Sequence, residues 1–261
     1  MLENELRVVE QAVQAAGEAI VRIADEHYQT AAEQADRSVV TKADLEADRI
    51  LRTHLTEAFP NYGWLSEETR EDKRRFATQR TWIVDPMDGT REFVMRNPEY
   101  VVSVALVEQE EPILGVIYNP LSKDLYAAIK GEGTSLNGQS VSCQHELTGR
   151  PKVEVSRSDI EKGRFSEYAA DLELLPCGSI AYKLARLAAG RVDSCLSVTP
   201  KNEWDIAAGV ILVMEAGGRV TDLAGKAYVF NQADTLVNGV IAATDTTYEQ
   251  IRNLVREKLE A

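Results

Sequence analysis

Residues 82–90, WIVDPMDGT, join an apolar run to a turn that carries two carboxylates. The apolar run predicts a strand, and we expect Pro86 to end it because proline has no N–H to donate to a strand ladder. Asp85 and Asp88 are three residues apart in this turn, so both side chains and the Met87 carbonyl can face one small volume. Mg²⁺ prefers such oxygen ligands. The turn is therefore a candidate metal site.

The residues that follow the turn are a candidate phosphate cradle. Gly89 and Thr90 lead into Arg91-Glu92-Phe93, where a helix can begin, and the free N–H groups of a helix N-terminus attract phosphate. An isolated Asp-Pro-x-Asp-Gly run is more often an ordinary surface turn, because turns use the same residues. Taken alone, the segment leaves a metal site and a plain turn both open.

Helices and strands are predicted on both sides of this turn. Apolar residues spaced by three and four positions indicate helices, and short apolar runs between turn residues indicate strands. The predicted helices cover residues 2–28, 43–60, 180–189, 206–216 and 248–259. The predicted strands cover residues 82–84, 101–107, 113–118, 125–129, 152–155, 194–198 and 237–243.

The order of these elements predicts two halves. Three strands in succession after the turn suggest an antiparallel meander, whereas the later alternation of strands and helices indicates α/β layering. The composition shifts in residues 142–151, which are rich in polar and turn-forming residues. We therefore expect an N-terminal α+β lobe, residues 1–145, that carries most metal ligands, and a C-terminal α/β lobe, residues 146–261.

The charge of the chain restricts its partners. The formal net charge is -13 and the isoelectric point about 4.8, which argues against binding of nucleic-acid polymers or membranes, because such partners need a basic surface. A small anionic substrate would instead need a local cation. We expect a cytoplasmic protein, because no segment has the length and apolarity of a membrane span and the first residues are acidic. The three cysteines, Cys143, Cys177 and Cys195, are expected to be reduced thiols.

Three further acidic positions accompany the turn. Alone, Asp44 could be a helix cap, Glu67-Glu68 a solvated helix start and Asp205 an exposed acid. Together with the turn and the run WDIAAG at residues 204–209, they resemble the lithium-sensitive, inositol monophosphatase superfamily. This superfamily includes inositol monophosphatases, bisphosphate nucleotidases, histidinol phosphatases and, more remotely, fructose-1,6-bisphosphatases. The resemblance covers essentially the whole chain and implies an α/β (α+β) fold, a layered αβαβα sandwich with metals at the junction of the lobes.

The resemblance also implies two or three Mg²⁺ ions per active site, for which Mn²⁺ could substitute. Glu67, Asp85 and the Met87 carbonyl would hold one ion. Asp85, Asp88 and Asp205 would hold a second, and a third, weaker ion would use Glu67.

The implied catalytic residues are Glu67, Thr90 and Asp44. Thr90, paired with Asp44, would help Glu67 to orient and deprotonate a metal-bound water for in-line attack on phosphorus. A metal can lower the pKa of bound water from 15.7 toward ~7, so no Ser or Cys nucleophile is needed. The resemblance further implies a small phosphorylated metabolite as substrate and a homodimer.

The residues near the predicted site favour a nucleotide substrate. Residues 88–93, DGTREF, look like those of the bisphosphate nucleotidases, whereas inositol monophosphatases more often show Thr-Asn-Phe. The inositol enzymes also tend to carry an acid where this chain has Val198. We expect a 3'(2'),5'-bisphosphate nucleotidase that hydrolyses 3'-phosphoadenosine 5'-phosphate to AMP and phosphate. The expected phosphate- and substrate-binding residues are Gly89, Thr90, Gly178, Ser179, Lys183 and Lys201.

Other functions stay open at this point. The chain could be an inositol-1-monophosphatase or a broad-specificity sugar or histidinol phosphate phosphatase, because substrate choice depends on pocket shape. Lys183 and Lys201 could equally be solvated surface cations. Arg157 also matches a nucleotidase-like stretch, without a defined role. A non-catalytic regulator is disfavoured, because every carboxylate expected to bind metal is present.

Overall fold

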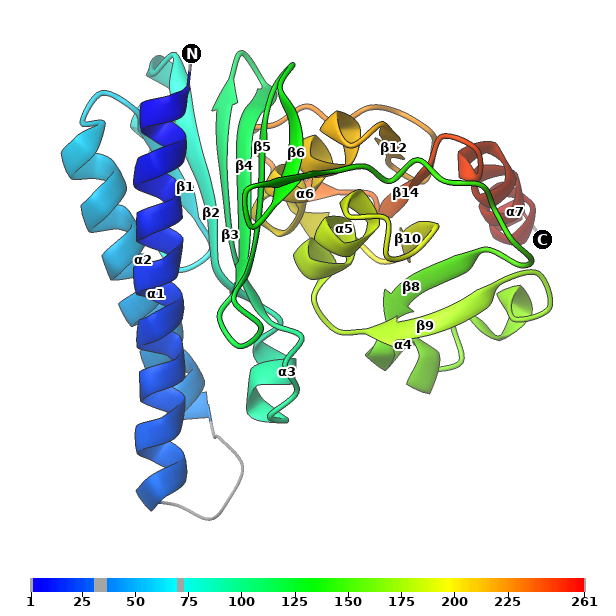
Figure 1. Cartoon of the computed structure of the whole chain (residues 1–261), viewed down its shortest axis with the longest axis horizontal. Helices are drawn as coiled ribbons and strands as arrows, with labels where there is room; N and C mark the ends of the chain where they lie inside the picture. The colour runs from blue at the N-terminus through cyan, green and yellow to red at the C-terminus, as the bar shows by residue number, and fades with distance from the viewer. Residues whose placement is uncertain (1, 31–36, 70–72, 261) are drawn as a thin grey trace.

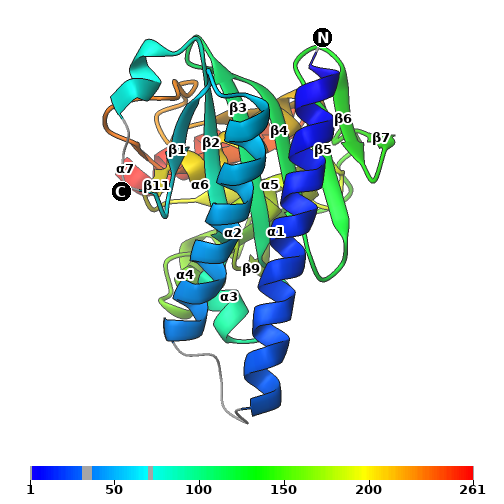
Figure 2. The ribbon, with the colours of Figure 1, turned by 90° about the vertical axis from the view of Figure 1, so that its left-hand side faces the viewer.

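Two long helices, α1 (Glu3–Thr30) and α2 (Arg37–Ala58), cover one face of a seven-stranded sheet (Figures 1 and 2). The structure is a computed structural model that describes residues 2–30, 37–69 and 73–260. None of the described helices is long and apolar enough to cross a membrane. The strands of the first sheet, in spatial order, are β1 (Gly63–Ser66), β2 (Arg80–Asp88), β3 (Val101–Glu108), β4 (Glu111–Asn119), β5 (Asp124–Ile129), β6 (Gly133–Leu136) and β7 (Gln139–Val141).

The predicted meander is confirmed, because each strand from β2 to β7 pairs antiparallel with the next. β1 lies parallel to β2 at the edge of the sheet. The sheet is buried on both faces, as the alternation along β2 shows. Trp82 and Val84 pack with the apolar side of α1 and α2, whereas Ile83 belongs to the core on the other face.

Two helices separate this sheet from a second, five-stranded one. These are α5 (Ile180–Ala188) and α6 (Glu203–Glu215), and α6 contacts β2, β3 and β4. The second sheet contains, in spatial order, β12 (Gly218–Thr221), β14 (Val240–Thr244), β10 (Ser194–Ser197), β8 (Lys152–Ser156) and β9 (Glu173–Cys177). Helix α7 (Tyr248–Glu260) packs against β14 through a third apolar cluster. The layers therefore follow the αβαβα order that the resemblance implied (Figure 1).

Close packing of α6 depends on two small residues. A Cβ at Gly209 would lie 2.6 Å from the Leu184 Cβ on α5, and a Cβ at Gly115 on β4 would lie 2.8 Å from the Ala208 carbonyl oxygen. Such distances exclude any larger residue without backbone movement. Because α6 is buried by α5 on one side and by the first sheet on another, its N-terminus, which carries Asp205, is fixed relative to β2.

The structure corrects several predicted boundaries. Pro86 does not end the strand: β2 runs to Asp88, and a register shift between Asp85 and Asp88 forms a β-bulge. A bulge tolerates proline because its extra residues leave the regular ladder. Helix α2 begins at Arg37, before the predicted start. The predicted strand over 237–243 is divided into β13 (Leu236–Val237), which pairs with β11 (Lys201–Asn202), and β14, with Gly239 at a positive φ of 68° between them.

Some elements had not been predicted. These are the strands β1, β6, β7, β9, β11 and β12, the short helix α4 (Arg157–Glu161), and the 3-10 turns η1 (Lys73–Ala77) and η2 (Ser166–Tyr168). The short helix α3 (Thr90–Val94) begins where a helix was expected, directly after the turn. The proposed lobe boundary at residue 145 lies between β7 and β8, and residues of both halves share the core around α5 and α6. The division into two lobes stays a prediction.

Candidate metal and phosphate site

A small cavity of about 150 Å³ lies where β2 ends and α5 and α6 begin. Ten of the twelve predicted site residues line it, although they come from segments far apart in the sequence. They are Glu67, Asp85, Met87, Asp88, Gly89, Thr90, Gly178, Lys183, Lys201 and Asp205. Ser156 and Ile180 complete the lining and had not been predicted. Asp44 and Ser179, the other two predicted residues, lie outside the lining.

The bulge in β2 determines how the first two carboxylates lie. Asp85 pairs in register with Ser103, and Asp88 pairs with Val101, so the two residues between them project out of the ladder. The Met87 amide donates to Asp85 Oδ1 at 3.0 Å, which closes a tight turn. Asp85 is almost completely buried and Met87 lines the cavity. The local geometry thus brings two carboxylates and the backbone between them to one place, as the sequence predicted.

Gly89 must be glycine in this turn. Its φ is +102°, which side chains with a Cβ rarely adopt, and a Cβ would lie 2.8 Å from the carbonyl oxygen of Glu99. Gly89 caps the N-terminus of α3 without a side-chain hydrogen bond. The backbone therefore turns sharply at the cavity wall, directly before Thr90.

Asp88 is held by the N-terminus of α5. Its Oδ2 accepts hydrogen bonds from the Ser179 hydroxyl at 2.5 Å and from the Ala181 amide at 2.6 Å. Ser179 is fully buried and its hydroxyl oxygen also accepts from the Tyr182 amide, so it caps α5. Ser179 thus fixes one oxygen of Asp88, a residue that lines the cavity. The direct phosphate contact expected of Ser179 stays a prediction.

The carboxylates raise one another's pKa values. Burial first, and then the charges of Asp88 and Glu67, raise the pKa of Asp85 well above its usual value. Burial and the charge of Asp88 raise the pKa of Asp205 to about 7. Desolvation and the charges of Asp88 and Glu68 likewise raise the pKa of Glu67 to about 7. By surface area Glu67 is exposed at the cavity mouth, so solvent weakens the effect there.

Two lysines oppose this negative charge. Burial raises the pKa of Asp88 above its usual value, and nearby hydrogen bonds and cations offset part of this rise. Lys183, one of these cations, is buried and donates through Nζ to the Cys177 carbonyl at 3.2 Å. Lys201 donates to the Thr199 hydroxyl at 3.1 Å and lowers the pKa of Asp88 and of Asp205. Lys183 is therefore not the solvated surface cation that its sequence left possible.

The donor set fits a hard divalent cation in composition. Four carboxylates and Met87 line one cavity, and a bound cation would relieve the repulsion that raises the pKa values of the carboxylates. One oxygen of Asp205 accepts a hydrogen bond from the Asn202 backbone amide at 2.8 Å. One oxygen of Asp88 likewise accepts a hydrogen bond from the Ala181 amide of α5, so the orientation of each carboxylate is fixed. Within residues 2–30, 37–69 and 73–260, no three His, Cys, Asp or Glu side chains are arranged so that they could hold a metal ion as they stand, so the fit is one of composition.

The loop that carries Glu67 is anchored by a residue that the sequence analysis missed. Asp48 on α2 accepts hydrogen bonds from the Ser66 and Thr69 hydroxyls, both at 2.5 Å. Its position four residues after Asp44 places both acids on one face of the helix, which is the only sequence signal for it. Asp44 is buried, and burial with the charges of Glu68 and Glu67 raises its pKa to about 8. Among the described residues, no hydrogen bond connects Asp44 with Thr90, so their pairing stays a prediction.

The continuation of the motif, Arg91-Glu92-Phe93, does not line the cavity. Arg91 pairs with Glu161 on α4 at 2.8 Å, and the buried Glu92 accepts from Asn97 at 2.6 Å. Phe93 packs edge-on against Tyr100. In this structure, then, the three residues fix the loop behind the cavity.

A second carboxylate behind the cavity, Glu99, had not been predicted either. Its Oε2 accepts from the Gly178 amide at 3.0 Å and from the Arg157 guanidinium at 2.8 Å. Arg157 therefore acts with Glu99 to hold the segment before α5. No short motif in the sequence marks this pair.

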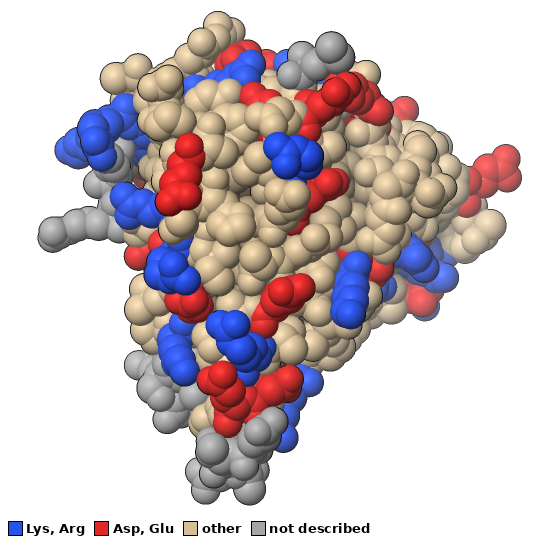
Figure 3. All heavy atoms as spheres, turned by 60° about the vertical axis from the view of Figure 1, so that its left-hand side comes forward, with Lys and Arg blue, Asp and Glu red and all other residues tan. Residues whose placement is uncertain are grey.

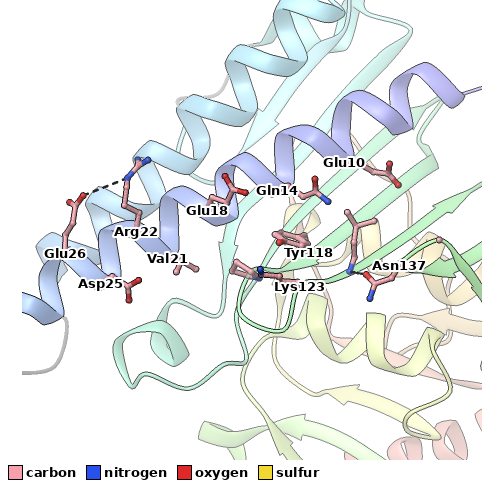
Figure 4. A pocket seen from close by; sticks show the side chains of 13 residues that line it. Glu10, Gln14, Glu18, Val21, Arg22, Asp25, Glu26, Tyr118, Lys123 and Asn137 are labelled. Carbon is pink, nitrogen blue, oxygen red and sulfur yellow. Dashed lines mark hydrogen bonds and ion pairs between the residues drawn. The ribbon is translucent and has the colours of Figure 1, made fainter.

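A larger hollow of about 930 Å³ lies elsewhere, between α1 and the β4–β5 hairpin (Figure 4). Its polar side chains are of both signs, with Glu10, Glu18 and Asp25 near Arg22 and Lys123. Acidic and basic side chains are also interspersed over the neighbouring surface shown in Figure 3. The acidic residues of this hollow all lie on α1, and Glu18, Asp25 and Glu26 are exposed. The smaller cavity instead gathers carboxylates from separate segments beside a backbone turn, so it is the better candidate for phosphate chemistry.

Comparisons with known proteins cover almost the whole chain. A family model described as "Inositol monophosphatase family" matches residues 1–260. An inositol-1-monophosphatase of Mesorhizobium japonicum is 34% identical over 236 residues, 85% of this chain and 84% of the relative. A 3'(2'),5'-bisphosphate nucleotidase CysQ of Escherichia coli is 33% identical over 228 residues, 85% of this chain and 92% of the relative. The crystal structure of CysQ from Bacteroides thetaiotaomicron has a TM-score of 0.79 and 29% identity, covering 92% of this chain and 97% of that one.

Proposed function

Because the chain belongs to the inositol monophosphatase family and is a phosphatase of small phosphate monoesters, we propose that it is a Mg²⁺-dependent 3'(2'),5'-bisphosphate nucleotidase. Its substrate would be 3'-phosphoadenosine 5'-phosphate, which it would convert to AMP and phosphate. The observation that carries the choice of substrate is the pair Lys183 and Lys201 in a cavity whose other charged residues are all carboxylates. Two cations suit a substrate with a second phosphate group.

The position of Val198 supports the same choice. The corresponding acid of the inositol enzymes would bind sugar hydroxyls, whereas Val198 is partly buried and packs against an apolar cluster. It offers no polar atom of its side chain to an inositol ring. The motif continuation after Asp88 gives weaker support, because those side chains pack behind the cavity.

We assign the metal ligands on the composition and gathering of the donor groups. Glu67, Asp85 and the Met87 carbonyl would hold one Mg²⁺, and Asp85, Asp88 and Asp205 a second, with Glu67 available to a third and Mn²⁺ as a substitute. When bound, the metal supplies an activated water and neutralises charge on the phosphate and the leaving oxygen.

The side chains of the chain itself would do the rest. Glu67, exposed at the cavity mouth with a raised pKa, would accept a proton from the attacking water. Thr90, at the start of α3, would orient that water, and Asp44 would support Thr90. The backbone at Gly89 and Thr90 would hold the transferred phosphate, while Lys183 and Lys201 would face the anionic substrate.

The alternative functions are an inositol-1-monophosphatase and a broad-specificity sugar or histidinol phosphate phosphatase. The first of these has equal support from the comparisons, because the inositol and nucleotide relatives are 34% and 33% identical to this chain. We also propose a homodimer, which light scattering of the purified chain would test.

A substrate panel tests the proposal. Values of kcat/KM would be measured with Mg²⁺ on 3'-phosphoadenosine 5'-phosphate, inositol 1-phosphate, histidinol phosphate and fructose 1,6-bisphosphate. We expect the nucleotide to be preferred. A preference of tenfold or more for inositol 1-phosphate would show that the nucleotidase proposal is wrong and that the alternative holds.

A further inference from the structure

The first turn of α6 is fastened to a loop that arrives from much later in the chain. Glu203, the first residue of α6, is 1% exposed. Its Oε2 accepts from the Asn231 amide at 2.6 Å and its Oε1 accepts from the Gln232 amide at 2.8 Å. The Glu203 amide in turn donates to the Thr235 carbonyl at 2.9 Å. One buried carboxylate thus binds two successive backbone amides of the loop.

The same loop is held from its other side by an arginine of the N-terminal half. Arg75 in η1 is also 1% exposed, and its guanidinium donates to Asn231 Oδ1 and to the Gln232 carbonyl, the latter at 2.7 Å. η1 packs on β1, where a Cβ at Gly63 would lie 2.9 Å from the Arg75 Cα. Residues 231–232 therefore lie between the buried guanidinium of Arg75 and the buried carboxyl group of Glu203. We call Arg75, Glu203, Asn231 and Gln232 the loop clamp.

The loop clamp connects two segments that carry proposed metal ligands. β1 ends at Ser66, directly before Glu67, and η1 contacts β1. Glu203 lies two residues before Asp205 in the same helical turn. The backbone amide of Asn202 donates a hydrogen bond to the Asp205 carboxylate. The side chain of Asn202 accepts a hydrogen bond from the Thr235 hydroxyl at 3.0 Å. A movement of the loop would therefore be transmitted to Asp205.

Burying a guanidinium and a carboxyl group on either side of a loop is an expensive way to hold it. Desolvation costs several kcal/mol per ion and is offset only by well-made hydrogen bonds, as both sides of the loop clamp provide. Replacing buried charged groups by apolar contacts is often neutral or stabilising, so stability alone does not account for this arrangement. Two-point hydrogen bonding on each side does, however, fix position more narrowly than apolar packing.

We propose that Arg75 and Glu203 are positioning residues that set Asp205 at its distance from Glu67 and Asp85, and thereby set the affinity of the site for divalent cations. Neither residue lines the cavity, so neither is a catalytic residue. The proposal rests on the metal site of the proposed function.

The test is direct binding of Mn²⁺, followed by the electron paramagnetic resonance signal of the free ion, without substrate. Glu203→Gln replaces one acceptor oxygen by an NH₂ group that faces a backbone amide and removes the charge opposite Arg75. Arg75→Lys keeps the charge but loses the two-point contact. The matched control is Arg80→Met, which removes an arginine paired with Glu108 at 2.8 Å at the far end of β2 from Asp88.

Substitution of a residue that supports a metal ligand typically lowers metal affinity by about tenfold or more. We expect Glu203→Gln to weaken Mn²⁺ binding about tenfold, Arg75→Lys to weaken it less, and Arg80→Met to bind as the wild type. Thermal unfolding distinguishes a displaced metal ligand from a general loss of stability. Arg80→Met should lower Tm by an amount comparable to the clamp variants without changing the affinity for Mn²⁺. At saturating Mg²⁺ the substrate KM of both clamp variants should stay at the wild-type value.

Three outcomes would overturn the proposal, and they differ in what else they overturn. Unchanged Mn²⁺ affinity in both folded clamp variants would refute the loop clamp and leave the proposed function intact. Absence of Mn²⁺ binding by the wild-type chain would refute the metal site and the loop clamp together. Equal weakening in Arg80→Met would also count against it, since a general loss of stability would then explain the effect.

Discussion

Replacement of Ser179 by alanine tests how the site is assembled. The substitution removes the hydroxyl that donates to Asp88 at 2.5 Å and accepts from the Tyr182 amide at 2.9 Å. A hydrogen bond to a charged group contributes about 1.5–3 kcal/mol, and an N-cap about 1 kcal/mol. The two share one hydroxyl, so we expect a loss of about 2–4 kcal/mol rather than a strict sum. For a chain of this size that lowers Tm by roughly 5–12 °C.

The same substitution should change metal affinity and its dependence on pH. The Ser179 hydrogen bond lowers the pKa of Asp88, so its loss raises that pKa. A carboxylate with a higher pKa stays protonated to higher pH, and protons then compete better with Mg²⁺. The acidic limb of the kcat/KM profile should therefore move to higher pH, and the Mg²⁺ concentration for half activation should rise.

The assays are thermal unfolding by circular dichroism and phosphate release as functions of pH and Mg²⁺. Ser194→Ala is the matched control, because Ser194 on β10 is also fully buried and its hydroxyl donates to the Ala242 carbonyl on β14 at 2.7 Å. The control should lose stability and keep the wild-type pH profile. A Ser179→Ala variant with unchanged Tm and unchanged Mg²⁺ requirement would refute the reasoning about Asp88.

Three further predictions concern the cavity. Asp88→Asn should reduce phosphate release to background while circular dichroism shows an intact fold, and wild-type turnover would remove Asp88 from the mechanism. Gly89→Ala should destabilise the fold by about 1–2 kcal/mol or more, because it forces a Cβ into a positive φ and against the Glu99 carbonyl; a denaturant midpoint equal to that of the wild type would contradict this. Li⁺ at tens of millimolar should inhibit by replacing one Mg²⁺. Ca²⁺ should not support activity, because its looser coordination differs from the octahedral geometry of Mg²⁺. Insensitivity to Li⁺, or full activity with Ca²⁺ alone, would show the corresponding expectation to be wrong.

The sequence predicted the parts of the fold that have strong periodicity. The apolar stripe of α1 and the runs of β3, β4 and β5 were found because each is long and its pattern matches the local geometry. β9, with sequence ELLPC, was missed because it is short and includes a proline. The bulge at Pro86 was missed because a local rule forbids proline in a regular ladder, whereas the register shift of the sheet accommodates it.

The candidate site was predictable where its residues follow one another in the sequence. Asp85, Asp88 and Gly89 lie in one turn, so spacing alone places them together. Three supporting carboxylates instead act through contacts that are distant in the sequence. Glu99 binds Gly178, which is 79 positions away, and Asp48 binds Ser66, which is 18 positions away. Glu203 binds Gln232, which is 29 positions away. Such contacts depend on tertiary packing, and no local sequence pattern indicates them.

The most direct test of the account is a crystal structure of the chain with Mn²⁺, with the ion located by its anomalous scattering. The account predicts anomalous peaks in the small cavity, within coordination distance of Asp85, Asp88 and Asp205. An empty cavity at saturating Mn²⁺, or ions bound only in the hollow beside α1, would contradict it.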